Sequence, residues 1–66
     1  MNITLNGNTT GFDTVSTISD LLEKLKLVPE TVVVELNTTI IQPDSYAATQ
    51  LSEGDGVEII RFVGGG

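Results

Sequence analysis

Polar and apolar residues alternate along the first six positions of the chain, which is typical of a strand with one face against a core. Met, Ile and Leu fall on one side of residues 1–6, and Asn and Thr fall on the other. An Asn-Gly-Asn sequence follows at residues 6–8 and favours a tight hairpin, because these residues tolerate positive φ. We therefore predict a strand over residues 1–6 and a short returning edge strand over residues 9–12.

From about residue 17 the spacing of the apolar residues changes to that of a helix. Thr17 stands three residues before Asp20, which resembles a capping box with Asp in place of Glu. Pro29 cannot continue a helix and restricts the residue before it, so the helix should end at or before Leu27. The apolar face of this helix is spaced at i, i+3, i+4 and i+7 and consists of Ile18, Leu21, Leu22 and Leu25.

The second half of the chain indicates short strands separated by turns. Residues 31–36 are rich in valine and predict a strand with Val33 and Glu35 on the side away from the core. A turn at residues 37–38 and a strand at residues 39–41 should follow. The remaining predicted elements are a tight turn or single helical turn at residues 42–44 that carries Tyr46, a mostly irregular segment at 47–51, a turn at 53–56 and a final strand at 57–63.

The final strand has apolar residues on both of its faces. Ile60 and Phe62 fall on the same side as Glu58, opposite the side expected to face the core. One interpretation is that the strand is covered on both faces or contains a bulge. The other, which we favour, is an exposed apolar patch that binds a partner, formed by Ile60, Phe62, Val33 and Val63.

Composition narrows the possible functions. The 66 residues suffice for one small domain, and they include no cysteine and no histidine. We therefore expect no disulfide, no zinc or other metal site, and no catalytic residue of the usual nucleophilic or acid-base kind. The chain is an α+β domain with one helix, which can cover only one face of one sheet.

Charge and hydropathy bear on the partners. Nine acidic against three basic residues give a net charge of −6, which opposes binding to nucleic acid. The same charge favours approach to a basic protein surface. No apolar run reaches the length of a membrane span and no signal peptide is recognisable, so we expect a cytoplasmic protein that does not bind membranes.

Three glycines follow the last strand. They have no side chains to bury and a high entropic cost of ordering, so they are not expected to stabilise the fold. We predict a globular domain at residues 1–63 and a flexible tail at residues 64–66. Such a tail can enter a narrow slot in another protein and carries an unhindered carboxylate at its tip.

Three segments together resemble the thiamine-biosynthesis sulfur carrier proteins, the ThiS family of ubiquitin-like β-grasp domains. They are Val-Glu-Leu-Asn at residues 34–37, Gly-Asp-Gly-Val-Glu-Ile at residues 54–59 and Arg-Phe-Val-Gly-Gly-Gly at residues 61–66. The last of them is the most specific. Two positions depart from the usual family pattern: Tyr46 stands where tryptophan is common, and Gly56 where a larger residue is usual.

The resemblance implies a mixed sheet of four to five strands packed on one α-helix, with the first and last strands as parallel neighbours. It also implies that an adenylating activating enzyme (ThiF-like) uses ATP to activate the carboxylate of Gly66, while Gly64 and Gly65 thread the tail into that enzyme. A sulfur donor such as a cysteine desulfurase then supplies the sulfur of a thiocarboxylate. A thiazole synthase (ThiG-like) consumes that sulfur. The chain would be a protein co-substrate, with no bound cofactor, and not an enzyme.

Two alternatives remain open at this stage. The carrier could serve molybdopterin synthesis or another sulfur-transfer pathway, since the small subunit of molybdopterin synthase is a β-grasp domain that also ends in Gly-Gly. The chain could also be a ubiquitin-like interaction module without covalent chemistry.

Overall fold

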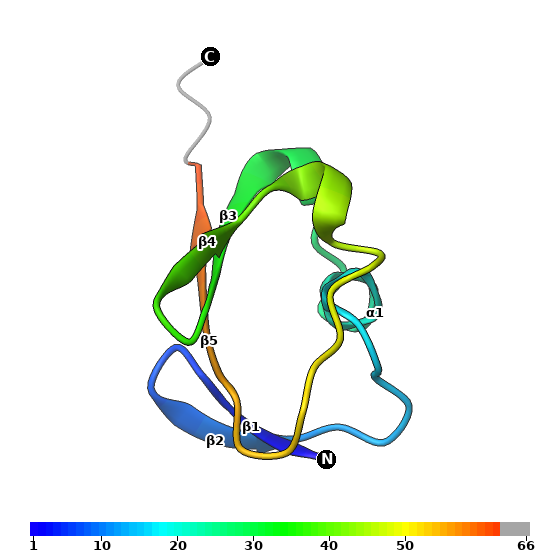
Figure 1. The fold of residues 1–66 in the computed structure, drawn as a ribbon, viewed down its shortest axis with the longest axis vertical. Coiled ribbons are helices and arrows are strands. Elements are labelled where there is room, and N and C mark those ends of the chain that lie inside the picture. The colour runs from blue at the N-terminus through cyan, green and yellow to red at the C-terminus, as the bar shows by residue number, and fades with distance from the viewer. Residues whose placement is uncertain (63–66) are drawn as a thin grey trace.

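The computed structural model describes residues 1–62 as a five-stranded sheet with one α-helix on one side (Figure 1). The strand order is β2-β1-β5-β3-β4, with β1 and β5 parallel and the other neighbours antiparallel. This is the mixed sheet implied by the resemblance. The elements are β1 (Asn2–Leu5), β2 (Asn8–Gly11), α1 (Ile18–Lys24), the 3-10 turn η1 (Pro29–Thr31), β3 (Val32–Leu36), β4 (Thr39–Ile41), the 3-10 turn η2 (Pro43–Ser45) and β5 (Gly56–Arg61).

Both hairpins close through two residues at positive φ. Asn6 and Gly7 (φ 48° and 85°) join β1 to β2, as the sequence predicted, and Asn37 and Thr38 (φ 49° and 73°) join β3 to β4. Turns of this kind match the right-handed twist of the flanking strands. Thr38 is unusual there, because β-branched residues rarely adopt positive φ.

The helix begins where the sequence predicted. Thr17 caps it: its hydroxyl accepts the N–H of Asp20 at 3.2 Å, and the carboxylate of Asp20 accepts the N–H of Thr17 at 3.1 Å and that of Ser16 at 3.0 Å. Three backbone N–H groups at the start of the helix thereby find acceptors.

The helix ends within the predicted limit, but for a different reason. The N–H of Leu27 bonds to the carbonyl of Leu22 at 2.9 Å, and that of Lys26 bonds to the carbonyl of Glu23 at 3.0 Å. Lys26 has φ 58°, so this is a Schellman ending with lysine in the position usually taken by glycine. Pro29 lies three residues further on and begins η1. None of the helices within residues 1–62 is long and apolar enough to cross a membrane.

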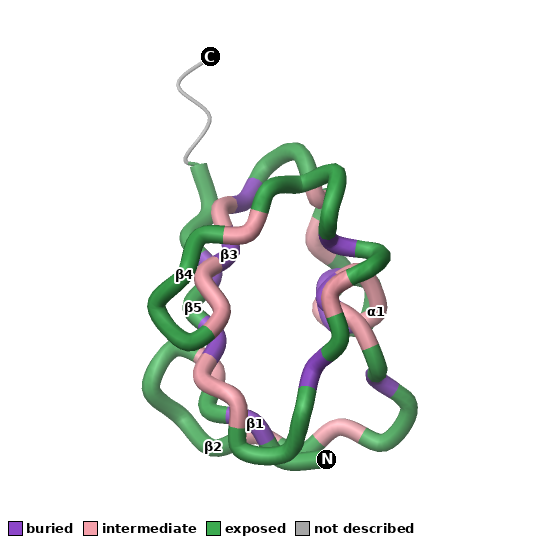
Figure 2. Tube along the Cα trace, viewed as in Figure 1, coloured by how far each residue is buried: buried purple, intermediate pink, exposed green. Residues whose placement is uncertain are grey.

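The hydrophobic core lies between the sheet and α1. Figure 2 shows buried residues in the strands and in α1, separated along the strands by more exposed ones. Tyr46, which follows η2, is among the largest fully buried side chains, and its hydroxyl donates to the carbonyl of Val32 at 3.4 Å. The core consists of Ile3, Val15, Ile18, Leu21, Leu22, Val32, Val34, Tyr46, Leu51, Val57 and Ile59.

Two asparagine side chains extend the hydrogen bonding of β5 beyond its strand partners. Oδ1 of Asn6 accepts the N–H of Ile59 at 2.8 Å, at the point where β1 has turned away. Oδ1 of Asn37 accepts the N–H of Gly56 at 2.8 Å, while its amide donates to Asp55 at 3.0 Å. Side chains from both hairpin turns therefore bind the backbone of β5. These bonds help to fix which side of the strand faces the helix.

Candidate protein-binding face

The two faces of β5 have opposite environments. Val57 and Ile59 are buried against the helix side, whereas the side chains of Ile60 and Phe62 are 52% and 60% exposed. The register with β3 runs without interruption from Val32↔Arg61 to Leu36↔Val57. Within residues 1–62, a bulge or a covering element on both faces, the first interpretation of this strand, is therefore wrong. Of the predicted apolar patch, Ile60 and Phe62 are exposed and Val33 is half-buried.

Neighbouring strands extend the patch. Val33 of β3 is half-buried and lies directly opposite Ile60 in the ladder. Ile40 of β4 is 58% exposed and pairs with Glu35, so it lies on the same side of the sheet. We call this surface the open face and define its apolar part by four residues, namely Val33, Ile40, Ile60 and Phe62.

Ile40 is not among the residues that the sequence pattern predicted for this surface. A signal was present, since Ile40 and Ile41 are adjacent and a strand directs neighbouring side chains to opposite faces. Ile41 packs against the core, which leaves Ile40 outside. The assignment also required the side of the sheet on which α1 lies, and the local pattern did not supply it.

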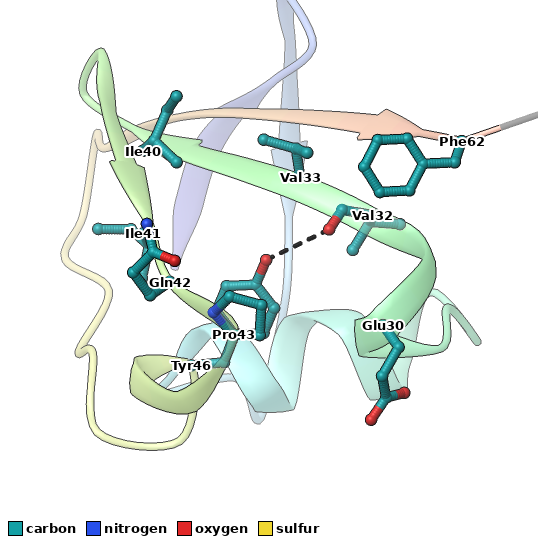
Figure 3. A pocket seen from close by; sticks show the side chains of 9 residues that line it. All are labelled: Glu30, Val32, Val33, Ile40, Ile41, Gln42, Pro43, Tyr46 and Phe62. Atoms are coloured by element: carbon teal, nitrogen blue, oxygen red, sulfur yellow. Dashed lines mark hydrogen bonds between the residues drawn. The ribbon is translucent and has the colours of Figure 1, made fainter.

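A shallow hollow adjoins the open face where β3 and β4 meet the two 3-10 turns. Figure 3 shows Ile40, Val33 and Phe62 on one side of the strands, and Tyr46 and Pro43 on the other. Its volume of about 180 Å³ is below the roughly 300–1,000 Å³ of small-molecule pockets. The residues around it are Glu30, Val32, Val33, Ile40, Ile41, Gln42, Pro43, Tyr46 and Phe62.

The end of the described chain lies beside this face. The N–H of Phe62 donates to the carbonyl of Thr31 at 2.9 Å, which holds the last described residue against the start of β3. The predicted contact residue Val63, the threading residues Gly64 and Gly65 and the modification site Gly66 lie outside the described residues. The predicted boundary between domain and tail lies there as well.

Titratable groups offer little chemistry in the described part of the chain. No cluster of three or more carboxylates within residues 1–62 is arranged to hold a metal ion. Hydrogen bonds from the backbone N–H groups of Ser16 and Thr17 lower the pKa of Asp20, which serves the helix cap. Burial raises the pKa of Tyr46, whose ring belongs to the core.

A five-stranded mixed sheet with parallel first and last strands, wrapped on one helix, defines a ubiquitin-like β-grasp domain. The family model described as the ThiS family matches residues 3–66. The chain belongs to the ThiS family.

Relatives and solved structures agree with this assignment. The chain is 44% identical over 50 residues to the sulfur carrier protein ThiS of Bacillus subtilis, covering 76% of each chain. It superposes on the crystal structure of a thiamine biosynthesis protein (ThiS) from Geobacter metallireducens with a TM-score of 0.83, 38% identity and full coverage of both chains.

Longer proteins contain a similar segment. The whole chain is 38% identical to part of a thiazole synthase of Magnetococcus marinus, and 36% identical to part of one of Paramagnetospirillum magneticum. In each case the chain spans only 20% of the length of that relative.

Proposed function

We propose that this protein is a sulfur carrier of thiamine biosynthesis that carries sulfur on the carboxylate of Gly66 and is not itself an enzyme. The observation that carries the proposal is the family match, which extends through the three terminal glycines. The Bacillus subtilis relative bears the name of a sulfur carrier protein. The open face beside the end of the described chain supplies a surface on which the modifying enzymes can dock.

The chemistry requires three steps at the tail. A carboxylate is a poor electrophile, so an activating enzyme joins an oxygen of the Gly66 carboxylate to the α-phosphorus of ATP and releases pyrophosphate. A persulfide sulfur then attacks the acyl carbon, and AMP leaves. Reductive cleavage of the resulting acyl disulfide by a thiol leaves a thiocarboxylate on Gly66. The carboxylate must lie in line with the phosphate inside a closed site.

Only a tail without side chains can enter such a site easily. Gly64 and Gly65 would fill the entrance, and the domain would remain outside. A thiazole synthase is the acceptor of the sulfur in this proposal. This choice of acceptor is supported by the thiazole synthases that contain a segment similar to this chain. ATP is used by the activating enzyme, so this chain needs no cofactor of its own.

Intact-mass spectrometry tests the proposal. The protein, produced with Gly66 as its last residue, is incubated with ATP, an activating enzyme of the ThiF type, a cysteine desulfurase and cysteine. The expected product is heavier by the difference between sulfur and oxygen. Deleting Gly65 and Gly66 should abolish this product, while changing the free energy of unfolding by less than about 0.5 kcal/mol, because the deletion is remote from the core. A shortened protein that still acquires sulfur at its new end would refute the role of Gly66.

A further inference from the structure

The open face contains two glutamates that lie directly opposite each other. Glu35 of β3 and Glu58 of β5 are partners in the antiparallel ladder, and the next pair on the same face is Val33↔Ile60. Side chains alternate along both strands, so both carboxylates extend from the open face. Like charges in directly opposite positions destabilise a sheet. The domain thus retains an unfavourable pair within its apolar patch.

No basic side chain of the chain relieves this repulsion on the open face. The three basic residues are Lys24, Lys26 and Arg61. The first two lie in α1 and immediately after it, on the other side of the sheet. Arg61 follows Ile60 in β5, so its side chain leaves the strand on the opposite face. A positive charge placed between the two carboxylates would therefore have to come from another molecule.

The surroundings of the two carboxylates favour a cation that also covers apolar surface. Glu35 is half-buried, and it lies between Glu58 on one neighbouring strand and Ile40 on the other. An arginine suits this site better than a lysine. Its planar guanidinium offers five donors in a fork that can bridge two carboxylates, it is weakly hydrated, and its stem packs on apolar side chains.

We propose that the open face binds a protein surface presenting an arginine, whose guanidinium lies between Glu35 and Glu58 while neighbouring apolar side chains of the partner cover Val33, Ile60 and Phe62. This inference rests on the proposed function in one respect: the partners to be tested are the activating enzyme and the thiazole synthase. The pair of Glu35 and Glu58 lowers the stability of the free domain and strengthens its binding to the partner.

Other occupants fit the face less well. A second copy of the chain related by a two-fold axis would bring two further carboxylates to the same place and add its own net charge of −6. The phosphates of a nucleic acid or of an anionic membrane would be repelled. The adjoining hollow is too small for most small-molecule ligands.

The experiment measures stability and affinity in the same variants. Glu35→Gln, Glu58→Gln and the double variant should each unfold at a higher temperature than the wild type, by about 1–4 °C, because the repulsion is removed. Their affinity for at least one of the two enzymes should fall about 10-fold or more, because the arginine loses its counter-charge. Glu23→Gln on α1 is the matched control. It makes the same change in net charge and should leave the affinity unchanged.

The identity of the partner residue is tested by chemical protection. Phenylglyoxal modifies exposed arginines, and at least one arginine of the partner enzyme should be protected in the complex with the wild type and reactive in the presence of the double variant. Protection restricted to lysines, measured with an amine-reactive reagent, would overturn the assignment to arginine.

Three results would overturn the inference as a whole. The first is that the glutamine variants bind both enzymes as tightly as the wild type, and the second is that they are less stable than it. The third is self-association of the wild type that the double variant strengthens, which would assign the face to a second copy. The proposed function fails separately, if Gly66 of the wild type is not converted to the thiocarboxylate although binding through the face is intact.

Discussion

Ile59 and Ile60 are adjacent in β5 and chemically identical, yet the structure gives them opposite environments. Ile59 is 9% exposed and belongs to the core, whereas Ile60 is 52% exposed on the open face. Strand geometry alone separates them, because successive side chains point to opposite faces. The apolar content of a strand therefore does not reveal what its residues stabilise. The position of each residue relative to the helix shows whether it stabilises the fold.

The composition of the two faces also differs. The covered face is apolar throughout its centre, and no polar or charged residue within residues 1–62 is buried. The open face combines exposed apolar residues with Glu35 and Glu58 in register. A covered face of this kind serves folding. A mixed face of exposed apolar and charged residues resembles the composition of a binding surface, with its apolar centre and charged contacts.

The same substitution at the two isoleucines tests this comparison most directly. Ile59→Ala should lower the free energy of unfolding by about 2–5 kcal/mol, because it removes buried methyl groups and leaves a cavity. Ile60→Ala should change it by less than about 1 kcal/mol, because the side chain is half exposed to water already. Thermal and urea unfolding of both variants, followed by circular dichroism, provides the measurement.

The result would contradict the comparison if Ile60→Ala destabilised the domain as strongly as Ile59→Ala. The sheet would then be covered on both sides in solution. Val34→Ala provides a second test on the covered face, since Val34 is fully buried and pairs with Ile59. Val34→Ala should lower the free energy of unfolding as strongly as Ile59→Ala does, and more than Ile60→Ala does.

Replacing Phe62 should weaken partner binding, whereas replacing Ile59 should weaken the fold. Its ring is 60% exposed and borders the hollow beside β3, so it is placed to act as an aromatic anchor for a partner. Phe62→Ala should weaken binding to the activating enzyme by about 1–2 kcal/mol, roughly 5- to 30-fold. Isothermal titration of the variant and the wild type measures this change. An unchanged affinity, with the fold intact, would remove Phe62 from the interface.

Local patterns predicted most of the fold. The alternation at residues 1–6, the Asn-Gly turn, the capping box and the valine-rich strand each correspond to an observed element. The end of the helix was predicted within its limit from Pro29, although Lys26 at positive φ provides the actual ending. A lysine in that conformation carries no local signal, because most lysines adopt negative φ.

The open face was predicted only in part, because its composition depends on strand register. Ile60 and Phe62 were found from the alternation of one strand. Ile40, and the placement of Glu35 against Glu58, required knowledge of which strands are neighbours and how they align. The same holds for the hydrogen bond from the N–H of Ile59 to Oδ1 of Asn6, which joins residues 53 positions apart.

Removing the charge of Asp20 at the cap of α1 should have the smallest effect on stability. Because the cap lies on the covered side of the sheet, this change should affect folding and not partner binding. Backbone N–H groups of Ser16 and Thr17 donate to the carboxylate of Asp20 and lower its pKa. A carboxyl whose pKa is lower in the folded than in the unfolded state contributes stability above its unfolded pKa, and this contribution is lost as the pH falls through the folded value.

Asp20→Asn should therefore reduce the melting temperature modestly at pH 7. The difference from the wild type should shrink as the pH falls from the ordinary carboxyl pKa of about 4, which applies to the unfolded chain, through the lower pKa of Asp20 in the folded protein. Affinity for the partner enzymes at pH 7 should be unchanged, because the helix lies on the covered side of the sheet. Melting curves of both proteins between neutral and acidic pH provide the measurement. A difference that stays constant with pH would show that the charge of Asp20 does not stabilise the cap, and a loss of affinity would show that the partner contacts the helix side as well as the open face.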